Sequence, residues 1–321
     1  MFFSILKSMD KIKVIDFDSG CGGFSKGLED SGFFEVVSNP LLNKNNNMCY
    51  NNTHINSFSS KDVIKKKDVD LVIYTPQGKK PNLKKISNYI AFLSINDFDN
   101  VIFVMKRDAI FSLDISEKVY LDGDNYPTRN FISCHLIELG YQVYQFVLDG
   151  AGFGLCHHNY YSIIWATKSG GNIKVKEGFG FFKRPYRFVK HVLRDVDDES
   201  DLNWHNVDYS KRNLCHKVLP GEKAFTTPSL SMNSGYVRLP ESFLELAFHY
   251  DFYRPSSKGP SIHPWFDRPI TLREGALLFG LSNDFIWDVN LKKNCVADMI
   301  FNSFPPFISK LMAGRIKKRI V

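Results

Sequence analysis

The sequence lacks long apolar runs, paired cysteines and internal repeats. No stretch approaches the ~18 consecutive apolar residues of a transmembrane helix, and the opening MFFSILKSMDK has no cleavage site typical of a signal peptide. We therefore expect an intracellular protein, cytoplasmic or nuclear, with no membrane partner. The six cysteines show no CxxC spacing, which argues against a disulfide framework or a zinc finger, and no metal is expected.

Charge and apolar content suit a soluble domain with a sizeable core. The chain has 321 residues, of which 44% are hydrophobic, and its net charge is +7. A modest basic excess is compatible with a nucleic-acid partner but does not require one, because many basic proteins bind no nucleic acid.

Short apolar runs alternate with helix-like segments in the first half of the chain. This order predicts an α/β fold with a doubly wound, mostly parallel sheet. After about Lys168 the sequence becomes glycine-rich and irregular. From Leu272 its spacing is helix-like again, and it ends on a predicted basic amphipathic helix. We predict a large domain from 1–168 and 286–321 and a smaller domain from 169–285. The strands are expected at 13–17, 34–38, 70–74, 100–105, 141–148 and 161–166.

A glycine cluster follows the first predicted strand, in DFDSGCGGFSKGLEDSGF from Asp16 to Phe33. A strand, a glycine turn and a helix let backbone amides approach a nucleotide-like ligand. The same spacing also fits a tight turn with a purely structural role, so the glycines alone leave both interpretations open.

The whole string, however, resembles the first motif of the DNA (cytosine-5) methyltransferases. His263 to Phe285 resembles the ninth motif of that family, and Asn302 to Pro305 resembles the tenth, in the family's order. The resemblance implies a class I S-adenosylmethionine-dependent methyltransferase fold with a smaller target-recognition domain. It also implies structural roles for four residues of the ninth motif, namely Arg268, Thr271, Arg273 and Glu274.

The sequence departs from this family where the family carries its chemistry. Gln77 follows Pro76 directly, where the family has a cysteine nucleophile, and Lys106 stands at the place of the catalytic glutamate. Asn159 and Tyr161 stand where the family has arginines. We therefore expect no catalytic residue and predict a catalytically degenerate homologue, not an enzyme, that acts by binding DNA. Two alternatives are an inactive subunit that pairs with an active methyltransferase, and an active DNA methyltransferase with relocated catalytic groups.

The cofactor positions are altered as well. The resemblance places Asp18 where the family has a phenylalanine against adenine, and Asn39 where an acidic residue binds ribose. No cofactor is expected, although S-adenosylmethionine is left open. The vestigial cofactor-binding set is Asp18, Gly20, Gly22, Gly23, Asn39 and Asn302.

Basic residues interleaved with aromatic ones give the predicted DNA contacts, since cations and ring faces suit phosphates and unstacked bases. The alternative is an ordinary charged surface. The predicted DNA-binding residues are Lys106, Arg107, Lys183, Arg184, Arg187 and Lys190. Cys156, beside His157 and His158, offers a substitute nucleophile or a zinc ligand as a further alternative.

Overall fold

The computed structural model describes residues 11–18, 21–37, 68–75, 83–106, 119–121, 124–126, 128–169, 187–194, 216, 219, 237–242, 261–283, 285, 287 and 292–321. Six predicted site residues lie outside these described residues. They are Gly20, Asn39, Gln77, Arg107, Lys183 and Arg184.

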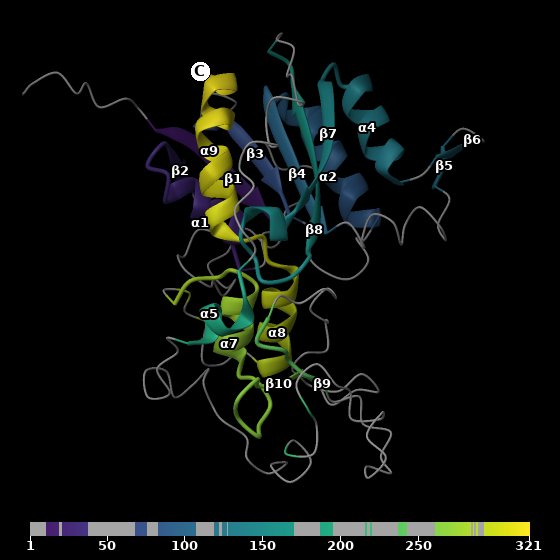
Figure 1. Cartoon of the computed structure of the whole chain (residues 1–321). Helices are drawn as coiled ribbons and strands as arrows, with labels where there is room; N and C mark the ends of the chain where they lie inside the picture. Colours follow the sequence, from purple (N-terminus) through teal and green to yellow (C-terminus); the bar gives the residue numbers. More distant parts are fainter. Residues whose placement is uncertain are drawn as a thin grey trace, which may run out of the picture.

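A six-stranded sheet forms the centre of the large lobe, in the order β2-β1-β3-β4-β8-β7 (Figure 1). The first four strands in this order are parallel, and β8 runs antiparallel to both neighbours. The fold prediction is therefore confirmed, and all six predicted strands are present. They are β1 (Ile12–Phe17), β2 (Phe34–Val36), β3 (Leu71–Tyr74), β4 (Asn100–Lys106), β7 (Gln142–Asp149) and β8 (Tyr160–Thr167).

Helices cover both faces of this sheet. One face packs against α1 (Gly23–Glu29) and α9 (Pro306–Ile320), and the other against α2 (Leu83–Asn96) and α4 (Thr128–Glu138). Strands with apolar side chains toward both layers have to be apolar throughout, and the fully buried β3 shows this. A separate two-stranded pair, β5 (Val119–Leu121) with β6 (Asp124–Tyr126), was not predicted.

The second lobe has its own apolar cluster. It gathers α5 (Val189–Leu193), α7 (Leu272–Leu278) and α8 (Lys293–Asn302), beside the short pair β9 (Val237–Arg238) and β10 (Ser261–Ile262). In Figure 1 these elements lie below the large sheet. The boundaries predicted for the two domains stay a prediction. No helix among the described residues is long and apolar enough to cross a membrane.

A buried ionic network orders the start of α7. The Thr271 side chain accepts from the Glu274 backbone, and the Glu274 carboxylate accepts from the Thr271 backbone at 2.8 Å, which is a capping box. Arg268 donates two bonds to the same carboxylate, at 2.8 and 2.9 Å. Arg273 donates at 2.8 Å to the carbonyl of Phe285. The structural roles expected of these residues are confirmed.

Candidate functional site at the carboxyl edge of the sheet

Four segments meet at the edge where the parallel strands end. They are the turn after β1, Thr75 after β3, Lys106 at the end of β4, and the connection from β7 to β8. Register pairs Lys106 with Tyr161 and Asp149 with Tyr160, so the β7–β8 connection lies at this same edge. In open α/β sheets, ligands bind at this edge.

Asp16 is the buried anchor of the turn after β1. Its carboxylate accepts hydrogen bonds from the hydroxyls of Ser25 and Thr75, the second at 2.9 Å. Burial raises the pKa of Asp16 to about 7, although both hydroxyls act to lower it. Asp16 thereby ties β1 to the start of α1 and to the end of β3, and it titrates near neutral pH.

Asp18 lies in the turn itself, with its backbone in the left-handed region at φ 55°. Lys85 of α2 places its Nζ 3.0 and 3.1 Å from the two Asp18 carboxylate oxygens. Asp18 is nearly buried, whereas the Lys85 side chain is half exposed. The turn therefore holds a fixed negative charge where the resemblance leads one to expect an aromatic ring.

The glycines of the turn serve close packing in this structure. Gly22 has φ 73°, in the left-handed region that favours glycine. A Cβ on Gly23 would lie 2.0 Å from the carbonyl oxygen of Phe304, just before α9. Asn302, another predicted cofactor residue, donates to the Asp298 carbonyl within α8 at 2.8 Å.

The residues that replace the family's arginines are packing residues. Asn159 donates to the Tyr161 hydroxyl at 2.5 Å, and that hydroxyl donates to the Ser303 carbonyl at 3.2 Å. The Tyr161 ring meets the Phe304 ring edge-on, with 4.7 Å between centroids. Asn159 and Tyr161 thus join β8 to the segment that leads into α9.

Cys156 is unsuited to act as a nucleophile. It is buried, its Sγ lies 3.8 Å from the Leu278 carbonyl, and burial raises its pKa to about 12. The neighbouring His157 is buried too, with Nε2 3.1 Å from that same carbonyl, and burial lowers its pKa to about 4. A reactive cysteine needs a thiolate, which this environment opposes. The pair instead links the β7–β8 connection to the end of α7.

Cys21, in the turn after β1, has a similar environment. It is buried with its Sγ 3.7 Å from the Met299 carbonyl, and burial raises its pKa to about 12. The described residues contain no group of three or more histidine, cysteine or acidic side chains that could hold a metal ion.

The pair of Asp149 and His158 was not predicted from the sequence. The Nδ1 of His158 lies 2.6 Å from the Asp149 carboxylate, and both side chains are about 30% exposed. Asp149 also accepts from the backbone of Ala151 and Asn159, which fixes its carboxylate. A carboxylate that orients a half-exposed imidazole is the arrangement of a general base. The signal in the sequence is an acid at the end of one strand and a histidine just before its hairpin partner.

Lys106 lies between two aromatic rings of the second lobe. Its Nζ is 3.3 Å from the centroid of Phe301 in α8 and 4.9 Å from that of Phe279, after α7. A lysine at this range is attracted by the negative face of each ring. Lys106 thus connects β4 to the second lobe, and its proposed contact with DNA stays a prediction.

Arg187 and Lys190 are exposed at the start of the second lobe. The Nζ of Lys190 lies 5.8 Å from the centroid of the exposed Phe188 ring. Both residues keep the accessibility that a contact with DNA requires, and that role too stays a prediction.

Comparisons with known proteins place this geometry among methyltransferases. No family model matches the chain. The chain is 27% identical to a candidate type II methyltransferase of Methanocaldococcus jannaschii, over 96% of this chain and 100% of that protein. The structure resembles a candidate DNA modification methyltransferase encoded within an E. coli prophage, with a TM-score of 0.65 and 16% identity over 97% of this chain and 99% of that one. It also resembles the S. pombe Dnmt2 methyltransferase, with a TM-score of 0.62 and 16% identity over 96% and 99% of the two chains.

These similarities correct one expectation and confirm another. The prediction that the chain is not an enzyme is wrong, because a relative matched over its full length is named as a methyltransferase and the similar solved structures are methyltransferases. The prediction rested on residue types at positions matched to one family, and such losses do not exclude catalysis by other residues. The sheet and its helices form the class I S-adenosylmethionine-dependent methyltransferase fold.

Proposed function

We propose that the chain is an S-adenosylmethionine-dependent methyltransferase that acts on DNA bases with relocated catalytic groups. The observation that carries the proposal is the His158–Asp149 pair, which is partly exposed at the same sheet edge as the turn after β1. The similarity to a methyltransferase along the whole chain supports the enzyme class.

The turn after β1 fits a cationic cofactor. S-adenosylmethionine carries a positive sulfonium and supplies an electrophilic methyl group. Asp18 offers a carboxylate at the turn, and the ion pair with Lys85, whose side chain is half exposed, holds it in place. These residues would bind and orient the cofactor.

The side chains at this sheet edge favour one kind of methyl acceptor on the DNA base. Methylation of carbon 5 of cytosine requires prior attack by a nucleophile, and Gln77 stands where a cysteine is expected. Among the described cysteines, the two that belong to the segments at this sheet edge are Cys21 and Cys156, and both are buried with pKa values raised to about 12, so neither of these two supplies a thiolate. An exocyclic amino nitrogen can attack the methyl carbon of S-adenosylmethionine directly: the N–C bond forms as the S–C bond breaks, S-adenosylhomocysteine leaves, and the amino group gives up one proton. We assign His158 as the acceptor of that proton and Asp149 as the group that orients the imidazole.

The test is transfer of a tritium-labelled methyl group from S-adenosylmethionine to duplex DNA, followed by digestion to nucleosides and chromatography. We expect an amino-methylated base as product. A positioned general base contributes typically ~10²–10⁴-fold, so His158→Gln should lower kcat by about that factor. The matched control is His135→Gln, since His135 bonds to its own helix backbone in α4.

Three results would count against the proposal. If the chain fails to bind S-adenosylmethionine in calorimetry, it is not a methyltransferase that uses this cofactor. A 5-methylcytosine product would show that the methyl group goes to carbon 5 and not to an amino nitrogen. Equal rates for the His158 and His135 variants would show that His158 is not the general base.

A further inference from the structure

A pocket of about 360 Å³ lies where the two lobes meet, and its lining includes none of the residues assigned to methyl transfer. The large lobe contributes the end of α1, the residues after Phe153 and the first turn of α9. The second lobe contributes Arg187, a residue of α5 and the end of α7. Its volume falls at the small end of the ~300–1,000 Å³ range of ligand pockets.

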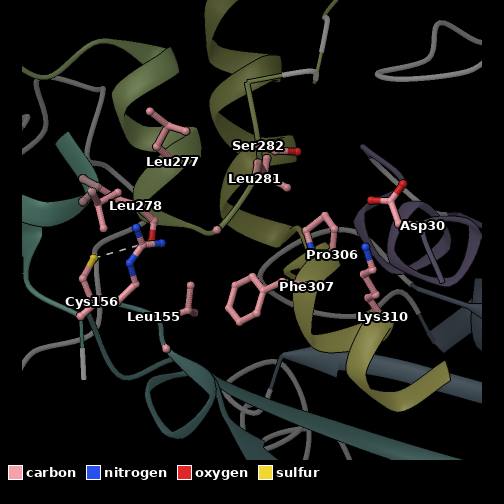
Figure 2. A pocket seen from close by; sticks show the side chains of 14 residues that line it. Asp30, Leu155, Cys156, Leu277, Leu278, Leu281, Ser282, Pro306, Phe307 and Lys310 are labelled. Carbon is pink, nitrogen blue, oxygen red and sulfur yellow. Dashed lines mark hydrogen bonds between the residues drawn. The ribbon is translucent and has the colours of Figure 1, made fainter. Parts of the chain in front are cut away.

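The pocket is apolar in the middle and charged at its ends. Figure 2 shows Cys156 and Leu278 at one end, Phe307 in the middle, and Asp30 with Lys310 at the other end. Gly280 has φ 79°, and a Cβ on it would lie 2.8 Å from atoms of both Leu155 and Phe307. This close approach brings the end of α7 against the Phe307 ring.

Arg187 belongs to the Cys156 end. Arg187 and Cys156 both line the pocket, and the positive charge of Arg187 acts to lower the pKa of the Cys156 thiol, against the larger effect of burial. Within the described part of the chain, neither Arg187 nor Lys310 forms an ion pair or hydrogen bond. The single carboxylate in the lining, Asp30, is already paired with Lys26 at 2.6 Å. The pocket is therefore positive overall.

We propose that this pocket binds a nucleotide, with its phosphate on Arg187, its base against Phe307, and its hydroxyls or base edge at Asp30 and Lys310. Guanidinium groups bind phosphate through paired hydrogen bonds, and base–aromatic contact is favourable for every base. The ligand touches Arg187 in one lobe and Phe307 in the other, so its binding would hold the lobes together.

Two sources share this chemistry, a free mononucleotide and a nucleotide within a nucleic-acid strand. Calorimetry with AMP, and separately fluorescence anisotropy with a labelled single-stranded oligonucleotide, distinguishes them. We expect Arg187→Gln to weaken binding at least tenfold and Lys310→Gln to weaken it several-fold. Lys318→Gln should change it less than twofold, because Lys318 is an exposed lysine on the same helix but outside the pocket.

If AMP binds and the Arg187 variant weakens its binding, the ligand of the pocket is a free nucleotide. If only the oligonucleotide binds, and the Arg187 variant weakens its binding, the ligand is a nucleotide within a strand. Binding that is equal in the Arg187 and Lys318 variants overturns the site. Displacement of AMP by S-adenosylmethionine overturns it as well, since AMP would then occupy the cofactor site. Thermal melting of each variant checks its fold. The inference does not rest on methyl transfer, so a failed methylation assay leaves it standing.

Discussion

A single added methyl group on α1 should separate two helices. A Cβ on Gly27 would lie 1.9 Å from the Pro306 carbonyl oxygen and 2.0 Å from the Ser309 Oγ of α9. The serine side chain can rotate away, but the carbonyl belongs to the backbone. Since a Cβ needs at least ~3.0 Å, α9 would have to move by about 1 Å. That shift would disturb buried side chains such as Ile308 and Met312.

We expect Gly27→Ala to lower the free energy of unfolding by about 2 kcal/mol or more. Overpacking typically costs about 1–3 kcal/mol, and the backbone shift adds to this, while alanine returns about 1 kcal/mol in helix propensity. The matched control is Gly314→Ala in α9, where a Cβ would meet nothing within 4 Å. That variant should gain about 0.5–1 kcal/mol.

Urea denaturation followed by circular dichroism measures both changes, provided that the slope of free energy against urea stays constant. The reasoning predicts changes of opposite sign in two variants with the same chemical substitution. If both variants were stabilised, the close packing of α1 on α9 would be refuted.

Three further predictions concern charged groups. Glu274→Ala should cost about 3–5 kcal/mol by urea denaturation, because Arg268 would be left buried without its carboxylate; a loss under 1 kcal/mol would contradict this. Lys106→Met should cost about 0.5–2 kcal/mol through the lost contact with the Phe301 ring, and an unchanged midpoint would refute the contact. The folded-state pKa of Asp16, about 7, lies above its unfolded value of ~3.9, so its contribution to stability is present at low pH and is lost as pH rises from about 4 to 7. Comparing the free energy of unfolding with that of Asp16→Asn at each pH cancels the opposite contribution of other groups, including His157. If the difference between the two proteins does not change with pH, Asp16 does not have a raised pKa.

The strands could be predicted because each combines an apolar run with a clear end. Six candidate runs became six strands of one sheet, with boundaries that differ by a few residues at most. The pair of β5 and β6 was missed because the β6 sequence, DNY, contains no apolar run that would mark a strand. The structural roles of Thr271 and Glu274 were expected from the resemblance, whereas the capping box that they form was seen only in the structure.

Long-range contacts explain what the sequence could not reveal. Gly23 looked like part of a ligand turn and Gly27 like an ordinary residue of the helix after it, yet each admits the backbone of a segment far later in the chain, at Phe304 and Pro306. The environment of Cys156 was equally hidden, because the carbonyl of Leu278 lies 122 residues away. A single sequence gives residue types, but burial and its effect on pKa depend on such distant partners.

The junction between the lobes is consistent with the relocated catalytic groups that we propose. Lys106 and His157, at or beside positions where the family carries catalytic groups, here contact the second lobe through Phe301 and the Leu278 carbonyl. Groups fixed in this way cannot approach a substrate without loosening the lobes. His158, the next residue, turns instead to Asp149 and remains partly exposed. In this arrangement His157 connects the lobes, while its neighbour His158 can reach a substrate. A variant at His158 should therefore lose catalysis without losing stability, and a variant at Lys106 should lose stability first.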